Sequence, residues 1–222
     1  MTLDAKIQQE YKILAEYKMI LSENVRGVYV IPSHDNSLHW YGVIFVRNGV
    51  YREGIFRFSI TLPDTFPADR KTPVITFTSE VYHPFICPEN KELDTRDAFP
   101  EWNTSCHVWQ LLKYLIYILE QPDICLSSPL NDQEESKKCR NVEALQLLEG
   151  NRDDFLAKIK VCIQESQEKV YESPSGDDDK HAIIFERWNP AIHDAILEKI
   201  KNNTPLDEIH QDDRSANTGI FP

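Results

Sequence analysis

The sequence predicts an α+β fold in which one helix precedes a four-stranded antiparallel meander, a long loop and three more helices. Three observations carry this prediction: helical spacing of apolar residues near the start, short β-branched and aromatic runs after it, and clean helical stripes beyond residue 102. The chain has 222 residues, 41% of them hydrophobic. That is enough for one domain with its own core plus an appendage.

The first predicted element is a helix over residues 7–22. Its apolar residues recur with helical spacing and give the helix a broad apolar face. One side of the helix carries Ile7, Tyr11, Leu14 and Leu21. Beside them lie Ile13, Tyr17 and Ile20.

Four strands are predicted next, because their residues are largely β-branched or aromatic. They cover residues 25–31, 38–46, 55–62 and 74–78. The pair Asn48-Gly49 predicts a tight turn between the second and third strands. Residues 62–67 contain two prolines without amide donors and therefore predict a loop, and residues 85–101 predict a second, longer loop.

Three helices follow this loop. The first has the clearest stripe of apolar residues and ends near Gln121. The second covers residues 133–148. The third starts at Asn151, which is expected to cap it, with Asp153 and Asp154 in its first turn. The residues expected to face inward are Val108, Leu111, Leu112, Leu115, Ile116 and Leu119 in the first helix, and Phe155, Ile159, Cys162, Ile163 and Val170 in the last.

The domain boundary is predicted at residue 172. Residues 1–172 form the globular domain, and residues 173–222 contain a polar, acidic linker, an amphipathic helix and a polar tail. The helix follows Trp188 and carries Ile192, Ile196, Leu197 and Ile200. Such an apolar face after a linker either docks on the domain or binds a partner helix, and the sequence leaves both open.

Composition excludes several classes of protein. The formal net charge is -12 without a basic block, which argues against binding nucleic acid. No run of residues is apolar enough to span a membrane, and the first ten residues do not resemble a signal peptide. The five cysteines are widely spaced and odd in number, which indicates reduced thiols inside the cell.

One region resembles the signature of ubiquitin-conjugating enzymes. A strand ends in Leu62-Pro63, the pair Phe66-Pro67 and Pro73 follow, and then come Tyr82-His83-Pro84 and Trp102 before a helix. This resemblance covers roughly residues 3–170 and implies the ubiquitin-conjugating-enzyme fold with an added C-terminal helix. Within that superfamily the chain is most similar to the fused-toes or Akt-interacting-protein family of inactive variants, and to its insect crossbronx members. The segments behind this narrower resemblance are 8–11, 27–30, 40–43, 98–102, 107–110 and 185–193.

The resemblance implies that the catalytic apparatus is missing. When Leu93-Asp94 is aligned with the family's Leu-Asp pair, Glu92 takes the place of the catalytic cysteine. Phe85 stands where the family's His-Pro-Asn triplet has asparagine. A carboxylate cannot carry ubiquitin as a thioester, and phenylalanine has no hydrogen-bond donor for an oxyanion. The chain is therefore predicted not to be a conjugating enzyme, with no catalytic, cofactor-binding or metal-binding residues.

Other residues in and near the loop offer alternative roles. Cys87 or Cys106 would be the nucleophile only if the active site had moved. His83 is expected to hydrogen-bond its own loop, and His107 lacks the partners of a metal site. Three acidic residues of the loop are expected to be solvated surface groups: Asp94, Asp97 and Glu101.

The family resemblance also implies a function and partners. Fused-toes proteins act as adaptors in complexes with Hook-type coiled-coil proteins that serve endosomal vesicle trafficking. The chain is accordingly expected to be a cytoplasmic, protein-binding adaptor that reaches endosomes through partners, without binding nucleic acid or inserting into a membrane. The alternative is a non-catalytic cofactor of ubiquitin conjugation that binds ubiquitin or an active conjugating enzyme.

Overall fold

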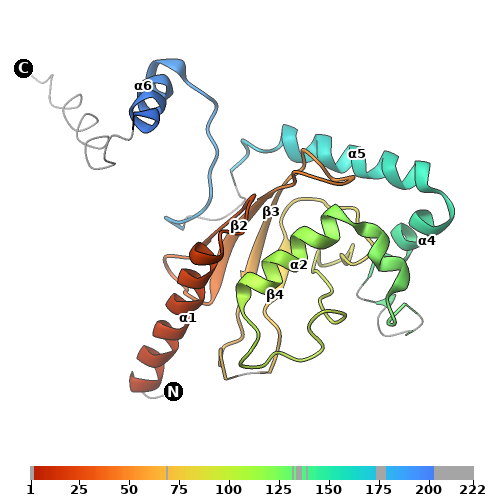
Figure 1. Cartoon of the computed structure of the whole chain (residues 1–222), viewed down its shortest axis with the longest axis horizontal. Coiled ribbons are helices and arrows are strands. Elements are labelled where there is room, and N and C mark those ends of the chain that lie inside the picture. Colours follow the sequence, from red (N-terminus) through yellow and green to blue (C-terminus); the bar gives the residue numbers. More distant parts are fainter. Residues whose placement is uncertain are drawn as a thin grey trace, which may run out of the picture. The chain divides into compact units, whose positions relative to one another are not determined.

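The computed structural model describes residues 3–68, 70–131, 133, 137–138, 140–173 and 179–202. It divides into two compact units, Met1–Ile184 and Phe185–Pro222. The elements of the first unit, most of them labelled in Figure 1, are α1 (Leu3–Glu23), β1 (Val28–Pro32), β2 (His39–Phe45), β3 (Ile55–Thr61), β4 (Val74–Phe77), α2 (Val108–Glu120), the 3-10 helix η1 (Pro122–Ser127), α4 (Val142–Gly150) and α5 (Arg152–Glu168). The second unit holds α6 (Pro190–Lys201).

The four strands form one antiparallel sheet in the order β1-β2-β3-β4, which confirms the predicted meander. In β2 and β3, Trp40 pairs with Ile60 and Val43 with Arg57. The turn between these strands contains Gly49, whose φ is +75°. A Cβ atom there would lie 2.3 Å from the carbonyl oxygen of Glu120 at the end of α2, so glycine is required both by conformation and by contact.

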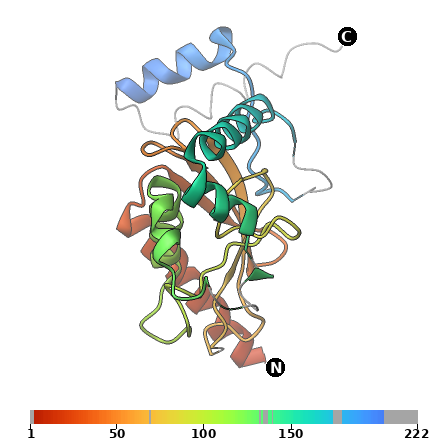
Figure 2. The same ribbon diagram turned by 90° about the vertical axis from the view of Figure 1, so that its right-hand side faces the viewer.

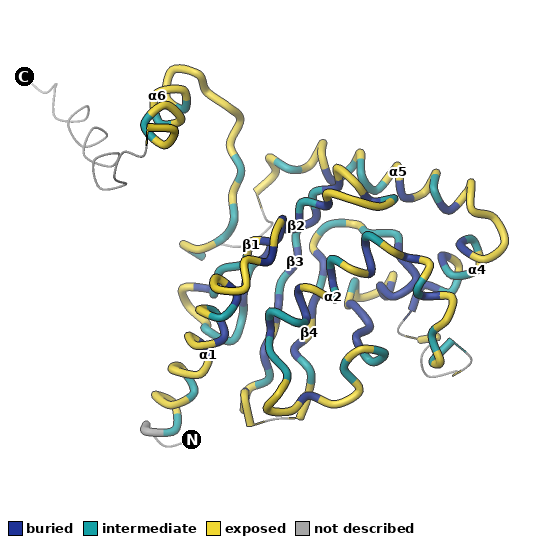
Figure 3. Tube along the Cα trace, viewed as in Figure 1, coloured by how far each residue is buried: buried dark blue, intermediate teal, exposed yellow. Residues whose placement is uncertain are grey.

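One face of the sheet packs against α2 and forms the core. In Figure 3 the facing parts of the sheet and α2 are mostly buried, and Figure 2 gives the view from the side. The apolar residues of α2 that face inward are buried as predicted, except that Ile118 takes the place expected for Ile116. Large side chains from the sheet fill the space against them: Trp40, Phe56, Phe58, Ile60, Ile75 and Phe77.

The first helix buries a narrower stripe than its sequence predicts. Ile13 and Ile20 are buried, and the ring of Tyr17 packs edge-on against Trp40 with centroids 6.0 Å apart. The other side of the predicted face is exposed: Ile7, Tyr11, Leu14 and Leu21. The helix touches the core along one line only, so the apolar positions on the neighbouring line stay in solvent.

The second predicted C-terminal helix, over 133–148, is described in part. Lys137 is helical and α4 begins at Val142, while 132, 134–136 and 139 lie outside the described residues. The side chain of Asn141 accepts a hydrogen bond from the amide of Ala144 at 2.9 Å, which caps the helix at this point. Asn151 caps α5 in the same way, as predicted, through the amide of Asp154.

The chain leaves α5 and returns to the sheet. Of the predicted linker, residues 174–178 lie outside the described residues, and residues 179–184 contact the sheet as part of the first unit. The boundary at residue 172 remains a prediction. The last predicted helix is confirmed as α6, which exposes Ile192, Leu197 and Ile200, and the predicted tail from residue 203 onward lies outside the described residues.

No helix among the described residues has the length and apolar character needed to cross a membrane.

Candidate functional site

The loop after β4 folds back on itself and brings the two family-defining positions close together. The amide of Asp94 donates to the carbonyl of Phe85 at 2.8 Å, and the amide of Cys87 donates to the carbonyl of Glu92 at 2.9 Å. Ile86 and Leu93 form an isolated antiparallel bridge between these pairs. The region aligned with the family's catalytic residues is therefore a short, paired loop, with Phe85 in one of its paired segments and Glu92 in the other.

Glu92 lies on the outside of this loop. Its side chain is exposed, its backbone bridges to Thr76 in β4, and its amide donates to the side chain of Asn90 at 3.1 Å. Beside it is a depression of about 170 Å³ that Cys87 and Arg96 also line. Ligand pockets usually hold about 300–1,000 Å³, so this depression is too small to enclose a substrate.

Phe85 points the opposite way, into the protein. It is 2% exposed, and the guanidinium carbon of Arg140 lies 4.1 Å from the centre of its ring. A cation over an aromatic face is attracted by the ring quadrupole, more strongly where water is excluded. The residue in the asparagine position therefore packs under an arginine and presents no polar atom to the loop surface.

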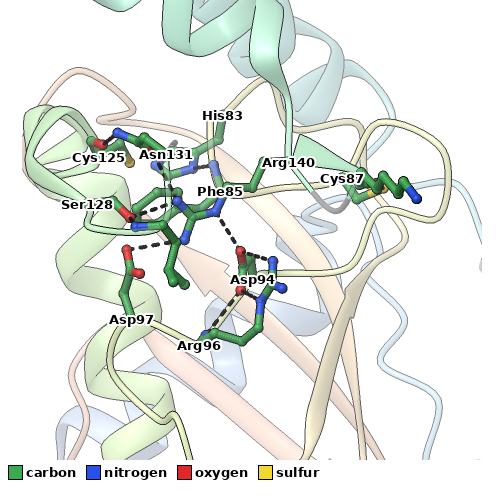
Figure 4. Close-up of polar contacts among 12 residues, drawn as sticks. His83, Phe85, Cys87, Asp94, Arg96, Asp97, Cys125, Ser128, Asn131 and Arg140 are labelled. Atoms are coloured by element: carbon green, nitrogen blue, oxygen red, sulfur yellow. Dashed lines mark hydrogen bonds and ion pairs between the residues drawn. The ribbon is translucent and has the colours of Figure 1, made fainter. Parts of the chain in front are cut away.

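Arg140 is the centre of a buried polar cluster (Figure 4). Its Nε donates to Asp94 Oδ2 at 2.5 Å, and one terminal nitrogen donates to Ser128 and Asn131 at 2.8 and 3.0 Å. The other terminal nitrogen lies 3.2 Å from Asp97 Oδ2. The cluster ties the loop after β4 to the segment between η1 and α4.

Asp94 is thus not a solvated surface group, and the prediction that it is one is wrong. Its side chain is 1% exposed and also accepts two hydrogen bonds from the guanidinium of Arg96 at 2.8 and 2.9 Å. Burial alone would raise the pKa of Asp94, but the hydrogen bonds from Arg96 and Arg140 outweigh it and lower that pKa. The prediction is also wrong for Asp97, whose side chain is 16% exposed and paired with Arg140, whereas Glu101 is exposed as predicted.

His83 uses both ring nitrogens inside the protein. Nδ1 accepts from the amide of Phe85 at 3.0 Å, and Nε2 lies 3.1 Å from the carbonyl of Ile118, to which it must donate. The ring is fully buried, and this desolvation lowers the pKa of His83 to about 4. A neutral imidazole with both nitrogens occupied holds the loop against α2, in the manner expected from the sequence.

Of the two cysteines considered as replacements, Cys87 lies in unfavourable surroundings. Cys87 lines the depression beside Glu92, yet it is only 4% exposed and its thiol lies 2.9 Å from the carboxylate of Glu89. Burial, followed by this hydrogen bond, raises the pKa of Cys87 and disfavours the nucleophilic thiolate. Cys106 lies two residues before α2, with its sulfur 3.9 Å from the carbonyl of Glu101.

His107 takes part in a helix cap. Its Nδ1 lies 2.9 Å from one carboxylate oxygen of Glu16, and the other oxygen accepts from the amide of Val108 at 3.0 Å. Among the residues that the structure describes, no three His, Cys, Asp or Glu side chains are grouped to hold a metal ion.

Comparisons with known proteins agree with this architecture. Residues 7–147 match the family model described as "Ubiquitin-conjugating enzyme". The chain is 50% identical to Protein crossbronx of Drosophila mojavensis over 199 residues, covering 89% of this chain and 79% of that protein. It is 42% identical to the Protein crossbronx homolog of Anopheles gambiae, covering 93% and 90% of the two chains.

A solved structure supports the fold alone. The chain resembles a crystal structure from Plasmodium yoelii that is described as a ubiquitin conjugating enzyme, with a TM-score of 0.57 and 21% identity over 70% of this chain and 93% of that one. Fold and loop together define a ubiquitin-conjugating-enzyme-like domain. The chain belongs to the ubiquitin-conjugating enzyme family and, within it, to the crossbronx proteins, which confirms that part of the sequence-based resemblance.

Arg140, the central residue of the buried cluster, could not be identified from the sequence. Its ion pair with Asp94 joins positions 46 residues apart, and neither residue lies in a periodic pattern. The available signal was local: an arginine directly before the capping Asn141 of an apolar helix. That position alone does not identify its partner.

Proposed function

We propose that this crossbronx-type chain does not conjugate ubiquitin and works instead as a protein-binding adaptor. The observation that carries the proposal is the pairing of an exposed carboxylate, Glu92, with a buried aromatic ring, Phe85, at the two positions where the family needs a thiol and an amide. Neither side chain can form the thioester or stabilise its oxyanion.

The surroundings of the loop favour the same interpretation. Cys87 is buried with a raised pKa, and His83 has a pKa near 4 with both nitrogens engaged, so neither supplies a nucleophile or an efficient base at neutral pH. The buried Asp94–Arg140 pair ties the loop to the segment before α4. A contact of this kind supports the fold without offering a reactive group.

Exposed apolar residues support binding to other proteins. The outer side of α1 exposes Tyr11 by 71% and Leu21 by 63%, and α6 exposes Ile192 and Ile200 by about half. Apolar side chains aligned on a helix favour a helical partner. Following the family resemblance, we take the partner to be a Hook-type coiled-coil protein, in a cytoplasmic complex that reaches endosomes through its other subunits.

A binding experiment tests this adaptor function. Purified chain is titrated with a Hook-type coiled coil and, separately, with ubiquitin, and binding is followed by calorimetry. Saturable binding to the coiled coil, lost when Tyr11 and Leu21 are replaced by serine, is expected. Binding to ubiquitin alone would contradict the trafficking proposal and favour a non-catalytic cofactor of ubiquitin conjugation.

A further inference from the structure

The outer face of the sheet, opposite α2, is covered by a segment of the chain itself. Residues 179–184, here called the strap, follow the undescribed residues 174–178 and belong to the same compact unit as the sheet. Figure 1 shows this part of the chain beside the sheet, on the side away from α2. The strap contacts the sheet at two places, one after β1 and one on β3.

The first contact is a carboxylate site after β1. Asp179 accepts hydrogen bonds from the hydroxyl of Ser33 at 2.5 Å and from the amides of His34 and His181 at 3.1 and 2.7 Å. Partial desolvation opposes ionisation, but these hydrogen bonds outweigh it and lower the pKa of Asp179. His181 also contacts the carbonyl of Pro32 through Nδ1, at 2.9 Å.

The second contact is at Arg57 on β3. Its guanidinium donates to the carbonyl of Ile183 in the strap and, at 2.9 Å, to the carbonyl of Val170 after α5. Desolvation lowers the pKa of Arg57, consistent with its covered position. Both acceptors are main-chain carbonyls, so this contact recognises an extended backbone and not one particular side chain.

Between these contacts the outer face of the sheet carries one buried apolar side chain, Val43. Val43 pairs with Tyr29 on one side and Arg57 on the other, which places all three on the outer face. Val43 is only 2% exposed, although it does not belong to the core cluster on the α2 side of the sheet. Arg57 is the β3 partner of Val43 and binds Ile183, so the strap is placed to cover this position.

We infer that this outer face is a docking surface for an extended segment of a partner protein, and that the strap occupies it as a displaceable intramolecular ligand. The partner segment carries a carboxylate about four residues before a residue held by its main-chain carbonyl, because Asp179 and Ile183 have that spacing and make the two anchoring contacts. The inference rests on the proposed adaptor function, for which it names a surface and the chemistry of a partner.

The test replaces the strap in the full-length chain and offers it back as a separate peptide. Residues 179–184 are changed to glycine and serine, and a fluorescent peptide with the sequence of residues 177–186 is added while anisotropy is recorded. The altered chain is expected to bind the peptide roughly tenfold or more tightly than the wild type, because the tethered strap competes at high effective concentration. Asp179→Lys in the full chain is a second, milder way to weaken the strap.

Matched variants locate the binding. In the altered chain, Arg57→Met is expected to abolish peptide binding, whereas Arg52→Met, at an exposed arginine paired with Glu53, leaves it unchanged. A peptide with lysine at position 179 is expected not to bind. Three results would each overturn the inference: no peptide binding by either strap variant, equal effects of the two arginine substitutions, or dimers formed by strap exchange in place of peptide binding. None of these results affects the coiled-coil titration, so the two proposals fail separately.

Discussion

The guanidinium of Arg140 lies 4.1 Å above the centre of the Phe85 ring while its Nε is bonded to Asp94 at 2.5 Å. One residue thus covers the aromatic ring in the asparagine position and neutralises the buried carboxylate that follows the position of the nucleophile. The loop that in conjugating enzymes is expected to serve chemistry is held here by a buried ion pair and an aromatic contact.

Removing Arg140 should be costly. In Arg140→Met the carboxylate of Asp94 stays buried with Arg96 as its remaining partner, and breaking a buried pair in this way typically destabilises a protein by about 3–5 kcal/mol. Arg152→Met is the matched control, since Arg152 and Asp123 are both about half exposed and such pairs contribute about 1 kcal/mol or less. Urea unfolding measures both. Equal losses would contradict a stabilising role for the Arg140 cluster.

Because His83 is buried, we expect the free energy of unfolding to decrease as the pH falls. Its pKa of about 4 in the folded protein lies below the ordinary 6.5, so the unfolded chain takes up the proton first as the pH falls. The contribution of His83 to the free energy of unfolding is fully present above pH 6.5. It is lost as the pH falls to about 4, by roughly 3 kcal/mol in all. Between pH 7 and pH 5 the wild type should lose about 2 kcal/mol more than His83→Gln, because other titrating groups are common to both. Parallel pH profiles in urea unfolding would contradict this assignment.

The exposed position of Glu92 can be tested with a thiol. Glu92→Cys should fold normally and add one cysteine that reacts rapidly with a disulfide reagent, whereas Cys87 and Cys125, both buried with raised pKa values, react slowly in the native protein. Peptide mapping by mass spectrometry after timed labelling identifies each site. Glu101→Cys, another exposed position in the loop, provides the control rate. A new thiol at position 92 as slow as Cys125 would show that the position is not exposed.

The contact between α1 and α2 depends on Glu16. Glu16→Ala removes the acceptor for the amide of Val108 and should cost about 1–2 kcal/mol, while Glu16→Gln keeps one acceptor and costs less. The control is Glu10→Ala in the same helix, which removes an exposed hydrogen bond to Ser37. Its free energy of unfolding should stay within about 0.5 kcal/mol of the wild type. A neutral Glu16→Ala measured by thermal unfolding would contradict the interhelical cap.

Elements with a local signal could be predicted from the sequence. The four strands, the stripe of α2 and the cap of α5 at Asn151 follow from periodicity and capping rules that need no knowledge of distant residues. The burial of α1 could not be predicted so well. Ile7 and Ile13 look alike in the pattern, and only the position of the core decides that Ile13 is buried.

Long-range polar contacts escaped prediction for a similar reason. Asp94 and Arg140 are separated by 46 residues, and Asp179 and Ser33 by 146. Taken alone, each of these residues is of a polar type that is common in solvated loops, since charged residues are mostly exposed unless paired. The tertiary fold brings each pair together, so the prediction failed for Asp94 although the loop itself was recognised.

The most direct test of the account is a thioester charging assay. The wild-type chain is incubated with activating enzyme, ATP and ubiquitin, beside an active conjugating enzyme, and the products are separated with and without reducing agent. The account predicts that only the active enzyme forms an adduct that reducing agent removes. A reducible adduct on this chain that is abolished by Cys87→Ser or Cys106→Ser would contradict it.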